Sequence, residues 1–195
     1  DSPMDKTTKQ INENVPFARK CIVAQCLFWC DVARRFKHNL HSKRKHVVRM
    51  EGEGGGGASS LPSSDPDEEF VVGVIGCGSI GSKFVRQLMK RGIVKANQIR
   101  VASRTPSKAQ ERCGLQVTSD NTDVASHCTV LFLFVLPFHF RNFSREIRDS
   151  IQSNRPLVVS SLAGFTPGYL QRALNTPFLV TTGIDIPTIQ EATSH

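Results

Sequence analysis

The segment of this chain with the clearest chemistry is a glycine-rich hexapeptide, Gly76-Cys77-Gly78-Ser79-Ile80-Gly81. It follows an apolar run of strand length and opens a segment with helical periodicity. In this context Gly76 permits a tight strand-to-helix turn, Gly78 lets the backbone approach a pyrophosphate, and Gly81 lets the helix pack closely on the sheet. Backbone N–H groups at the start of the helix would face the phosphates. We therefore expect all six residues to bind a dinucleotide cofactor, with Gly76, Gly78, Ser79, Ile80 and Gly81 at its pyrophosphate. The alternative is a turn that serves packing only.

A second polar cluster, Ser103-Arg104-Thr105, ends the next predicted strand. Ser103 follows Gly81 by 22 residues, close to the offset of about 20 at which an acidic residue selects NAD by binding the ribose 2′-hydroxyl. No carboxylate occurs between Gly81 and Glu111. Arg104 can instead bind a 2′-phosphate, with hydroxyl donors from its two neighbours. The pattern favours NADP, the alternative being that Arg104 is an ordinary solvated charge beside a turn.

These motifs need a sheet to position them, and the chain from Phe70 onward predicts one. Apolar runs of strand length alternate with helical segments, which is typical of a parallel sheet covered by helices. We expect an α/β fold with a Rossmann-type doubly wound sheet. The predicted strands are 70–75, 98–103, 115–118, 128–135, 157–161 and 178–181. A first helix is predicted to start inside the glycine motif and to end at Gly92, and further helices are predicted at 107–112, 121–127, 137–153 and 167–174.

The first 69 residues have a different character. The net charge of +8 divides into +7 over residues 1–50, −6 over 51–70 and +7 over 71–195. Apolar residues at helical spacing over 12–36 predict an amphipathic helix, and 34–49 is strongly basic. Residues 51–69 are rich in Gly, Ser, Pro and acid, which predicts a flexible linker. The expected domains are therefore a helix with a basic end (1–50), a linker (51–69) and a dinucleotide-binding domain (70–195).

Composition excludes several classes of protein. At 195 residues with 39% hydrophobic content the chain is neither collagen-like nor wholly disordered. Its longest apolar run, 129–140, is too short to span a membrane. No signal peptide or C-x-x-C pair accompanies the six cysteines, so we expect reduced thiols and a cytoplasmic location.

Several motifs in register resemble the pyrroline-5-carboxylate reductase-like family, and most closely its NADP-dependent oxidoreductase-domain branch. They are VVGVIGCGSIGSKF, RGIV, IRVASRTP, GLQVTSDN, TVLFLFVLP and VVSSLAGFT, and they span about residues 70–175. The resemblance implies that Asn121 lies against the adenine-side ribose. It also implies that Val135, Leu136 and Pro137 lie along the cofactor and that Ala163 is near the nicotinamide.

Two features depart from the reductase pattern. Leu136 stands where the reductases usually have the Lys of a Val-Lys-Pro motif, and 179–187 replaces their Asn-Thr-Pro loop. The family's helical C-terminal domain, which dimerises and supplies the imino-acid site, is not expected within this chain. The catalytic residues therefore stay unassigned, and homo-oligomer formation stays open.

Three other features of the sequence give weaker indications of function. Cys21, Cys26 and Cys30 near two histidines follow a helix stripe rather than a metal-ligand spacing, so we expect no metal. Cys77 at a helix N-terminus could have a lowered pKa and be a redox-sensitive thiol, the alternative being a small side chain that fits the turn. The basic segment 34–49 could bind nucleic acid or an anionic membrane, but a solvated helix end is favoured.

Taken together, the residues favour an NADP(H)-binding oxidoreductase domain that transfers hydride to a C=N or C=O small-molecule substrate. The alternative is a non-catalytic NADP(H)-binding sensor or partner-binding module. We expect neither a membrane span nor a nucleic-acid partner.

Overall fold

The structure is a computed structural model that describes residues 3–51 and 70–183. Six short strands run parallel to one another in one sheet, in the order 3-2-1-4-5-6. This order changes direction between the first and fourth strands, and ligands of such sheets bind beyond the carboxyl ends of the strands at that point. The Rossmann-type fold expected from the sequence is confirmed. The strands are β1 (Val72–Ile75), β2 (Ile99–Ala102), β3 (Val117–Thr118), β4 (Val130–Leu133), β5 (Leu157–Ser160) and β6 (Leu179–Thr181).

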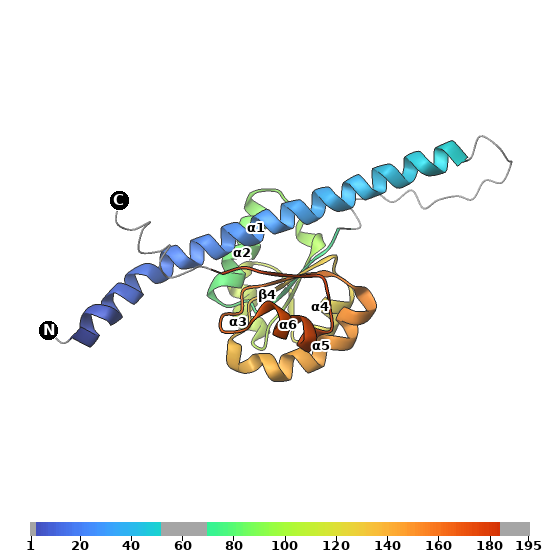
Figure 1. Ribbon diagram of the computed structural model, residues 1–195. Helices are drawn as coiled ribbons and strands as arrows, with labels where there is room; N and C mark the ends of the chain where they lie inside the picture. The colour runs from blue at the N-terminus through green and yellow to red at the C-terminus, as the bar shows by residue number, and fades with distance from the viewer. Residues whose placement is uncertain (1–2, 52–69, 184–195) are drawn as a thin grey trace.

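Helices cover both faces of this sheet (Figure 1). The first, second and third α-helices pack into one apolar cluster, and the fourth, fifth and sixth pack into a second cluster on the opposite face. The α-helices are α1 (Pro3–Glu51), α2 (Ser79–Lys90), α3 (Pro106–Cys113), α4 (Asn121–Ser126), α5 (Phe140–Asn154) and α6 (Pro167–Leu174), and two 3-10 turns are η2 (Ala96–Gln98) and η3 (Pro137–His139).

The two central strands explain why the sequence reads as continuous apolar runs. Every residue of β1 and β4 is buried, with alternate side chains belonging to opposite clusters. In β4, Val130 and Phe132 face the cluster that contains α2, whereas Leu131 and Leu133 face the cluster that contains α5. Strands buried on both faces need apolar side chains at every position, unlike the half-exposed strands of many antiparallel sheets.

The glycine that ends α2 has the conformation expected of it. Gly92 has a φ of +62°, and the N–H groups of Gly92 and Ile93 donate to the carbonyls of Met89 and Leu88 at 3.1 and 3.2 Å. This closing turn satisfies carbonyls that the helix itself leaves without partners.

The N-terminal helix is longer than the segment 12–36 that the periodicity predicts. It runs from Pro3 to Glu51 and includes the basic segment 34–49. Helix-compatible residues continue to Glu51, and the run Gly54–Gly57 that follows shortly disfavours continuation. Most of the expected linker, 52–69, lies outside the described residues, so the division into 1–50, 51–69 and 70–195 stays a prediction.

One stripe of α1 is part of the core. Val23, Cys26, Leu27 and Cys30 are each at most 7% exposed and belong to the same cluster as Phe132 of β4. The helix therefore completes the cover over one face of the sheet, alongside α2. Within the described ranges, no helix has an apolar stretch long enough to cross a membrane.

Candidate dinucleotide-binding site

The turn between β1 and α2 requires glycine at two of its three glycine positions. Gly76 has a φ of +94°, and a Cβ there would lie 2.5 Å from the carbonyl oxygen of Phe134. A Cβ on Gly81 would overlap the carbonyl oxygen of Gly76. Both glycines are thus explained by the fold alone.

Gly78 is different, because a Cβ built on it meets nothing within 4 Å. Its φ of −77° is open to any residue, so neither strain nor crowding within the chain calls for glycine there. Gly78 is also the N-cap of α2, with no side-chain capping bond and no acidic residue in the first turn. The first N–H groups of the helix are therefore available to an anion that approaches over Gly78.

Cys77 does not have the environment that its place in the turn suggests. Its side chain is 3% exposed, and burial raises the pKa of its thiol from 9.0 to about 12, with further raising contributions from neighbouring Cys113. The lowered pKa considered for this helix N-terminus is wrong, because desolvation is the largest contribution and raises the pKa, whereas nearby Arg112 and Arg86 lower it by less. Cys77 is a small buried side chain of the turn, and its sulfur lies 3.9 Å from the carbonyl oxygen of Ala109.

The second polar cluster lies next to this turn, at the end of the neighbouring strand. The N–H of Ser103 donates to the carbonyl oxygen of Thr118 at 2.9 Å, and the N–H of Thr105 lies 3.4 Å from Ser103 Oγ. Thr105 begins α3 as its N-cap without making a side-chain capping bond. Arg104 is exposed and has no hydrogen-bond or ion-pair partner among the described residues. A cation and two hydroxyls are thus available to a ligand at this end of β2.

A cavity of about 420 Å³ joins the two clusters at the carboxyl edge of the sheet. Its further walls come from the ends of β1 and β4, the start of α4 and one face of α5. Within the part of the chain that the structure describes, Glu146 is the one acidic side chain of the lining. The lining residues are Ile75, Gly76, Cys77, Gly78, Ser103, Arg104, Thr105, Arg112, Asn121, Phe134, Val135, Leu136, His139, Asn142, Phe143 and Glu146.

The structure brings together most of the residues expected at a dinucleotide site, although their roles stay predictions. Nine of them line this cavity: Gly76, Cys77, Gly78, Ser103, Arg104, Thr105, Asn121, Val135 and Leu136. Ser79, Ile80 and Gly81 form the first turn of α2, and Pro137 begins η3 beside Leu136. Ala163 lies between β5 and α6 and is not part of the lining.

Four polar lining residues fall outside the motifs read from the sequence: Arg112, His139, Asn142 and Glu146. His139, Asn142 and Glu146 follow one another at steps of three and four residues, so they share one face at the start of α5. That spacing was a usable signal, because a polar stripe on a helix after β4 must face either solvent or the carboxyl edge of the sheet. Arg112 belongs to the last turn of α3.

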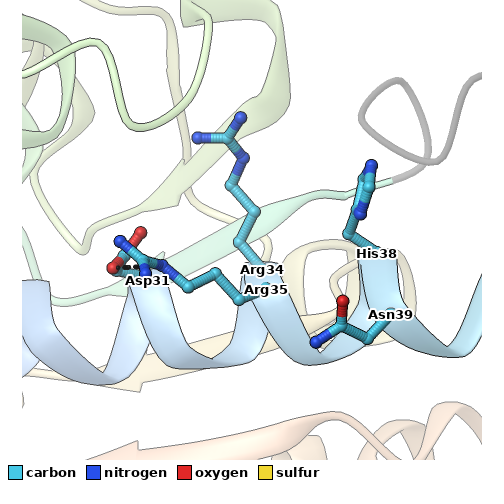
Figure 2. Close-up of a pocket in the computed structure, with 5 residues that line it drawn as sticks. All are labelled: Asp31, Arg34, Arg35, His38 and Asn39. Carbon is cyan, nitrogen blue, oxygen red and sulfur yellow. Dashed lines mark ion pairs between the residues drawn. The ribbon is translucent and has the colours of Figure 1, made fainter.

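A second hollow, lined by Asp31, Arg34, Arg35, His38 and Asn39, lies on α1 (Figure 2). Arg35 pairs with Asp31 at 2.8 Å, and Arg34 Nη1 donates to the carbonyl oxygen of Ile93 at 3.0 Å. At least one cation of this basic segment thus holds the helix to the domain. Among the described residues, no group of three or more His, Cys, Asp or Glu side chains is arranged to hold a metal ion.

Comparisons with known proteins agree with this geometry. Residues 71–164 match the family described as NADP oxidoreductase, coenzyme F420-dependent. The chain is 33% identical over 103 residues to mouse NADP-dependent oxidoreductase domain-containing protein 1. The aligned region covers 52% of this chain and 28% of the mouse protein. It is 29% identical over 126 residues to pyrroline-5-carboxylate reductase 2 of Dictyostelium discoideum, covering 61% and 42% respectively.

Solved structures show the same fold. The pyrroline carboxylate reductase of Plasmodium falciparum, solved with NADP bound, superposes with a TM-score of 0.52 at 20% identity, covering 62% of this chain and 44% of that one. The pyrroline-5-carboxylate reductase of Coxiella burnetii gives 0.53 at 23% identity, covering 65% and 55%. The chain spans less than half the length of the mouse and Dictyostelium relatives.

The sheet order, the glycine turn and the cavity define a Rossmann-type fold. The match of residues 71–164 places this fold beside the NADP oxidoreductases. The two curated relatives are named as an NADP-dependent oxidoreductase domain-containing protein and a pyrroline-5-carboxylate reductase. Within that class, the chain is similar in sequence to pyrroline-5-carboxylate reductases and to NADP-dependent oxidoreductase domain-containing protein 1.

Proposed function

We propose that this domain binds NADP(H) and presents it for hydride transfer to a small-molecule substrate with a C=N or C=O bond. The observation that carries the proposal is the cavity itself: the open backbone at Gly78 and the unpaired Arg104 line the same space at the ends of adjacent strands. The family match and the relatives named as reductases support the reaction class.

The residues present fit a dinucleotide. The N–H groups over Gly78 would hold the pyrophosphate, and Arg104 with the hydroxyls of Ser103 and Thr105 would hold the 2′-phosphate. Val135 and Leu136 would lie along the cofactor toward the substrate. When bound, the reduced nicotinamide supplies the hydride, and the protein orients the ring and shields it from water.

The substrate is proposed by family likeness, as a cyclic imine of the kind named in the relatives. The six free thiols of the chain support a reducing compartment such as the cytoplasm.

Calorimetric titration of the purified chain with NADPH and NADH tests the cofactor assignment. We expect NADPH to bind more tightly, and Arg104→Gln to weaken NADPH by about 10- to 100-fold because a charge-assisted hydrogen bond is lost. NADH should change by less than about threefold, since it lacks the 2′-phosphate that Arg104 would bind. Equal losses for the two cofactors would contradict the assignment.

Arg148→Gln is the matched control, because Arg148 is an exposed arginine of α5 that does not line the cavity. NADPH oxidation in the presence of pyrroline-5-carboxylate and a panel of cyclic imines then tests the reaction. Turnover above the rate without substrate supports a reductase, whereas binding of NADPH without turnover of any imine or carbonyl compound would contradict it for this chain.

A further inference from the structure

Glu146 contacts the amide of Asn121 inside the cavity and stands outside every motif that predicts dinucleotide binding. Both carboxylate oxygens of Glu146 accept from Asn121 Nδ2, at 3.1 and 3.2 Å. The two residues are 25 positions apart, on α5 and α4, and both line the cavity. This contact therefore joins two walls of the site.

The contact determines which way the amide of Asn121 faces. An ionised carboxylate only accepts hydrogen bonds, so the NH₂ group of Asn121 must be the part turned toward Glu146. The carbonyl oxygen, Oδ1, is then on the other side of the planar amide. Among the described residues Oδ1 has no hydrogen-bond partner, so it is left as an acceptor for a donor on the ligand.

Both partners are held in place by the structure around them. Asn121 begins α4 directly after Asp120, whose carboxylate caps the helix by accepting from the N–H groups of Thr122 and Asp123. Because Asp120 does the capping, the Asn121 side chain is not needed for it. Glu146 lies on α5 between buried Phe143 and Ile147, which fix that face of the helix against the sheet.

The charge of Glu146 is unfavourable for the ligand that this cavity fits. No described cation lies within ion-pair distance of its carboxylate, so its negative charge is not paired by the residues that the structure describes. A dinucleotide phosphate is itself anionic, and like charges in one cavity repel. A carboxylate at this position therefore needs a role that outweighs repulsion.

We propose that Glu146 is a positioning residue that holds the Asn121 amide so that Oδ1 accepts a hydrogen bond from a ribose hydroxyl of the adenosine half of the cofactor. The inference rests on the proposed function, because it requires a dinucleotide in this cavity. It assigns Glu146 to the orientation of Asn121 and not to direct contact with the ligand.

Two neutral substitutions separate orientation from charge. Glu146→Gln removes the charge but keeps an oxygen that can accept from Asn121 Nδ2, whereas Glu146→Met removes both in a side chain of similar length. If Glu146 positions Asn121, the Gln variant binds NADPH about as tightly as wild type or somewhat more tightly, and the Met variant binds about 5- to 10-fold more weakly. If Glu146 acts through charge alone, both variants bind equally well and more tightly than wild type.

Calorimetry with NADPH and with adenosine 2′,5′-bisphosphate gives the readout in the full chain. The bisphosphate should lose affinity in the Met variant by the same factor as NADPH, because the affected contact is to the adenosine half. In an Asn121→Ala background, Glu146→Met should have no further effect. Asp149→Asn is the control for loss of a carboxylate from α5 outside the cavity lining.

The outcomes distinguish this inference from the proposed function. A wild-type chain that binds neither NADPH nor NADH overturns both. Binding by wild type with equal affinities for the Gln and Met variants overturns only the role of Glu146. Thermal unfolding of each variant checks that the fold is kept, and Glu146→Ala, which should weaken binding as the Met variant does, replaces it if Glu146→Met does not fold.

Discussion

The side chain of Gln25 donates a hydrogen bond from Nε2 to the carbonyl oxygen of Gly183 at 3.1 Å, which joins residues 158 positions apart. Close by, Cys26 Sγ lies 3.9 Å from Thr182 Oγ1 in the buried interface. The N-terminal helix is thus in contact with the chain just after the last strand. The helix packs against the six-stranded sheet through buried side chains.

This contact predicts that the buried face of α1 contributes to the stability of the whole domain. Leu27 is 3% exposed within the shared core, so Leu27→Ala should lower the free energy of unfolding by about 2–4 kcal/mol. Phe28, the next residue, is 61% exposed. Phe28→Ala should therefore change the free energy of unfolding by less than about 0.5 kcal/mol. Urea unfolding followed by circular dichroism measures both. Equal small effects would mean that α1 does not pack on the domain in solution.

The glycines of the turn are expected to separate folding from binding. Gly81→Ala places a Cβ against the backbone carbonyl of Gly76 and should destabilise the fold by about 1–3 kcal/mol. The Cβ added by Gly78→Ala meets no atom of the chain, so the thermal stability of this variant should match wild type. Its affinity for NADPH should fall at least tenfold, because the Cβ would stand where the pyrophosphate approaches the backbone. Thermal unfolding and calorimetry measure the two quantities. Unchanged affinity in Gly78→Ala would argue against pyrophosphate binding over this turn.

Stability should fall at high pH because buried thiols have raised pKa values, and three of these thiols lie outside the glycine turn. Burial raises the pKa values of Cys26, Cys30 and Cys128 from 9.0 to about 12. Above pH 9 the unfolded chain releases protons that the native state retains, so the unfolded state gains relative stability. Each thiol should lower the free energy of unfolding by up to about 1 kcal/mol per pH unit between pH 9 and 12, with little effect below pH 8.

Urea unfolding from pH 7.5 to 11 measures this dependence. Lysine and tyrosine residues also titrate in that range, so the comparison is with a variant in which all three cysteines are alanine. That variant should be less stable at pH 7.5 but lose less stability toward pH 11. Parallel pH profiles for the two proteins would show that the thiols do not carry the effect.

The thiol in the glycine turn should be unreactive in the native protein. Because burial raises the pKa of Cys77, little thiolate is present at pH 8, and the side chain is also inaccessible. Half-buried Cys21 should react first with iodoacetamide, and Cys77 only after unfolding. Mass spectrometry of tryptic peptides over time measures the order. Early alkylation of Cys77 would indicate that the turn opens.

The sequence was sufficient for most of the fold because its signals are local. All six strands were predicted within about two residues of their observed bounds, and the helix Pro167–Leu174 has the bounds that were predicted. Apolar runs that must be buried on both faces, together with a glycine turn of fixed geometry, leave few alternatives for such a sheet.

The wall of the site formed by α5 has only a partial signal in the sequence, because the polar spacing of His139, Asn142 and Glu146 fits a face toward solvent as well as one toward the site. Glu146 becomes part of the cavity only because α5 packs beside α4, and nothing within either helix shows that pairing. The pKa of Cys77 depends likewise on what surrounds the turn, in particular Cys113 and the carbonyl of Ala109. The length of α1 was underestimated because a basic segment lowers the apolar periodicity without preventing a helix.

The place of α1 on the sheet has a consequence for how the chain folds. During synthesis this helix is made first, but the strands it covers, β4 and β5, and its partner Gly183 are made more than 75 residues later. Its neighbour α2 is made sooner, but until β4 and β5 follow, the stripe of Val23, Cys26, Leu27 and Cys30 lacks the sheet surface that it covers. Such partly exposed apolar surface favours chaperone binding or aggregation. Docking of the first helix is therefore a late event with a high sequence separation, and we expect it to make folding slower than for a domain closed by local contacts.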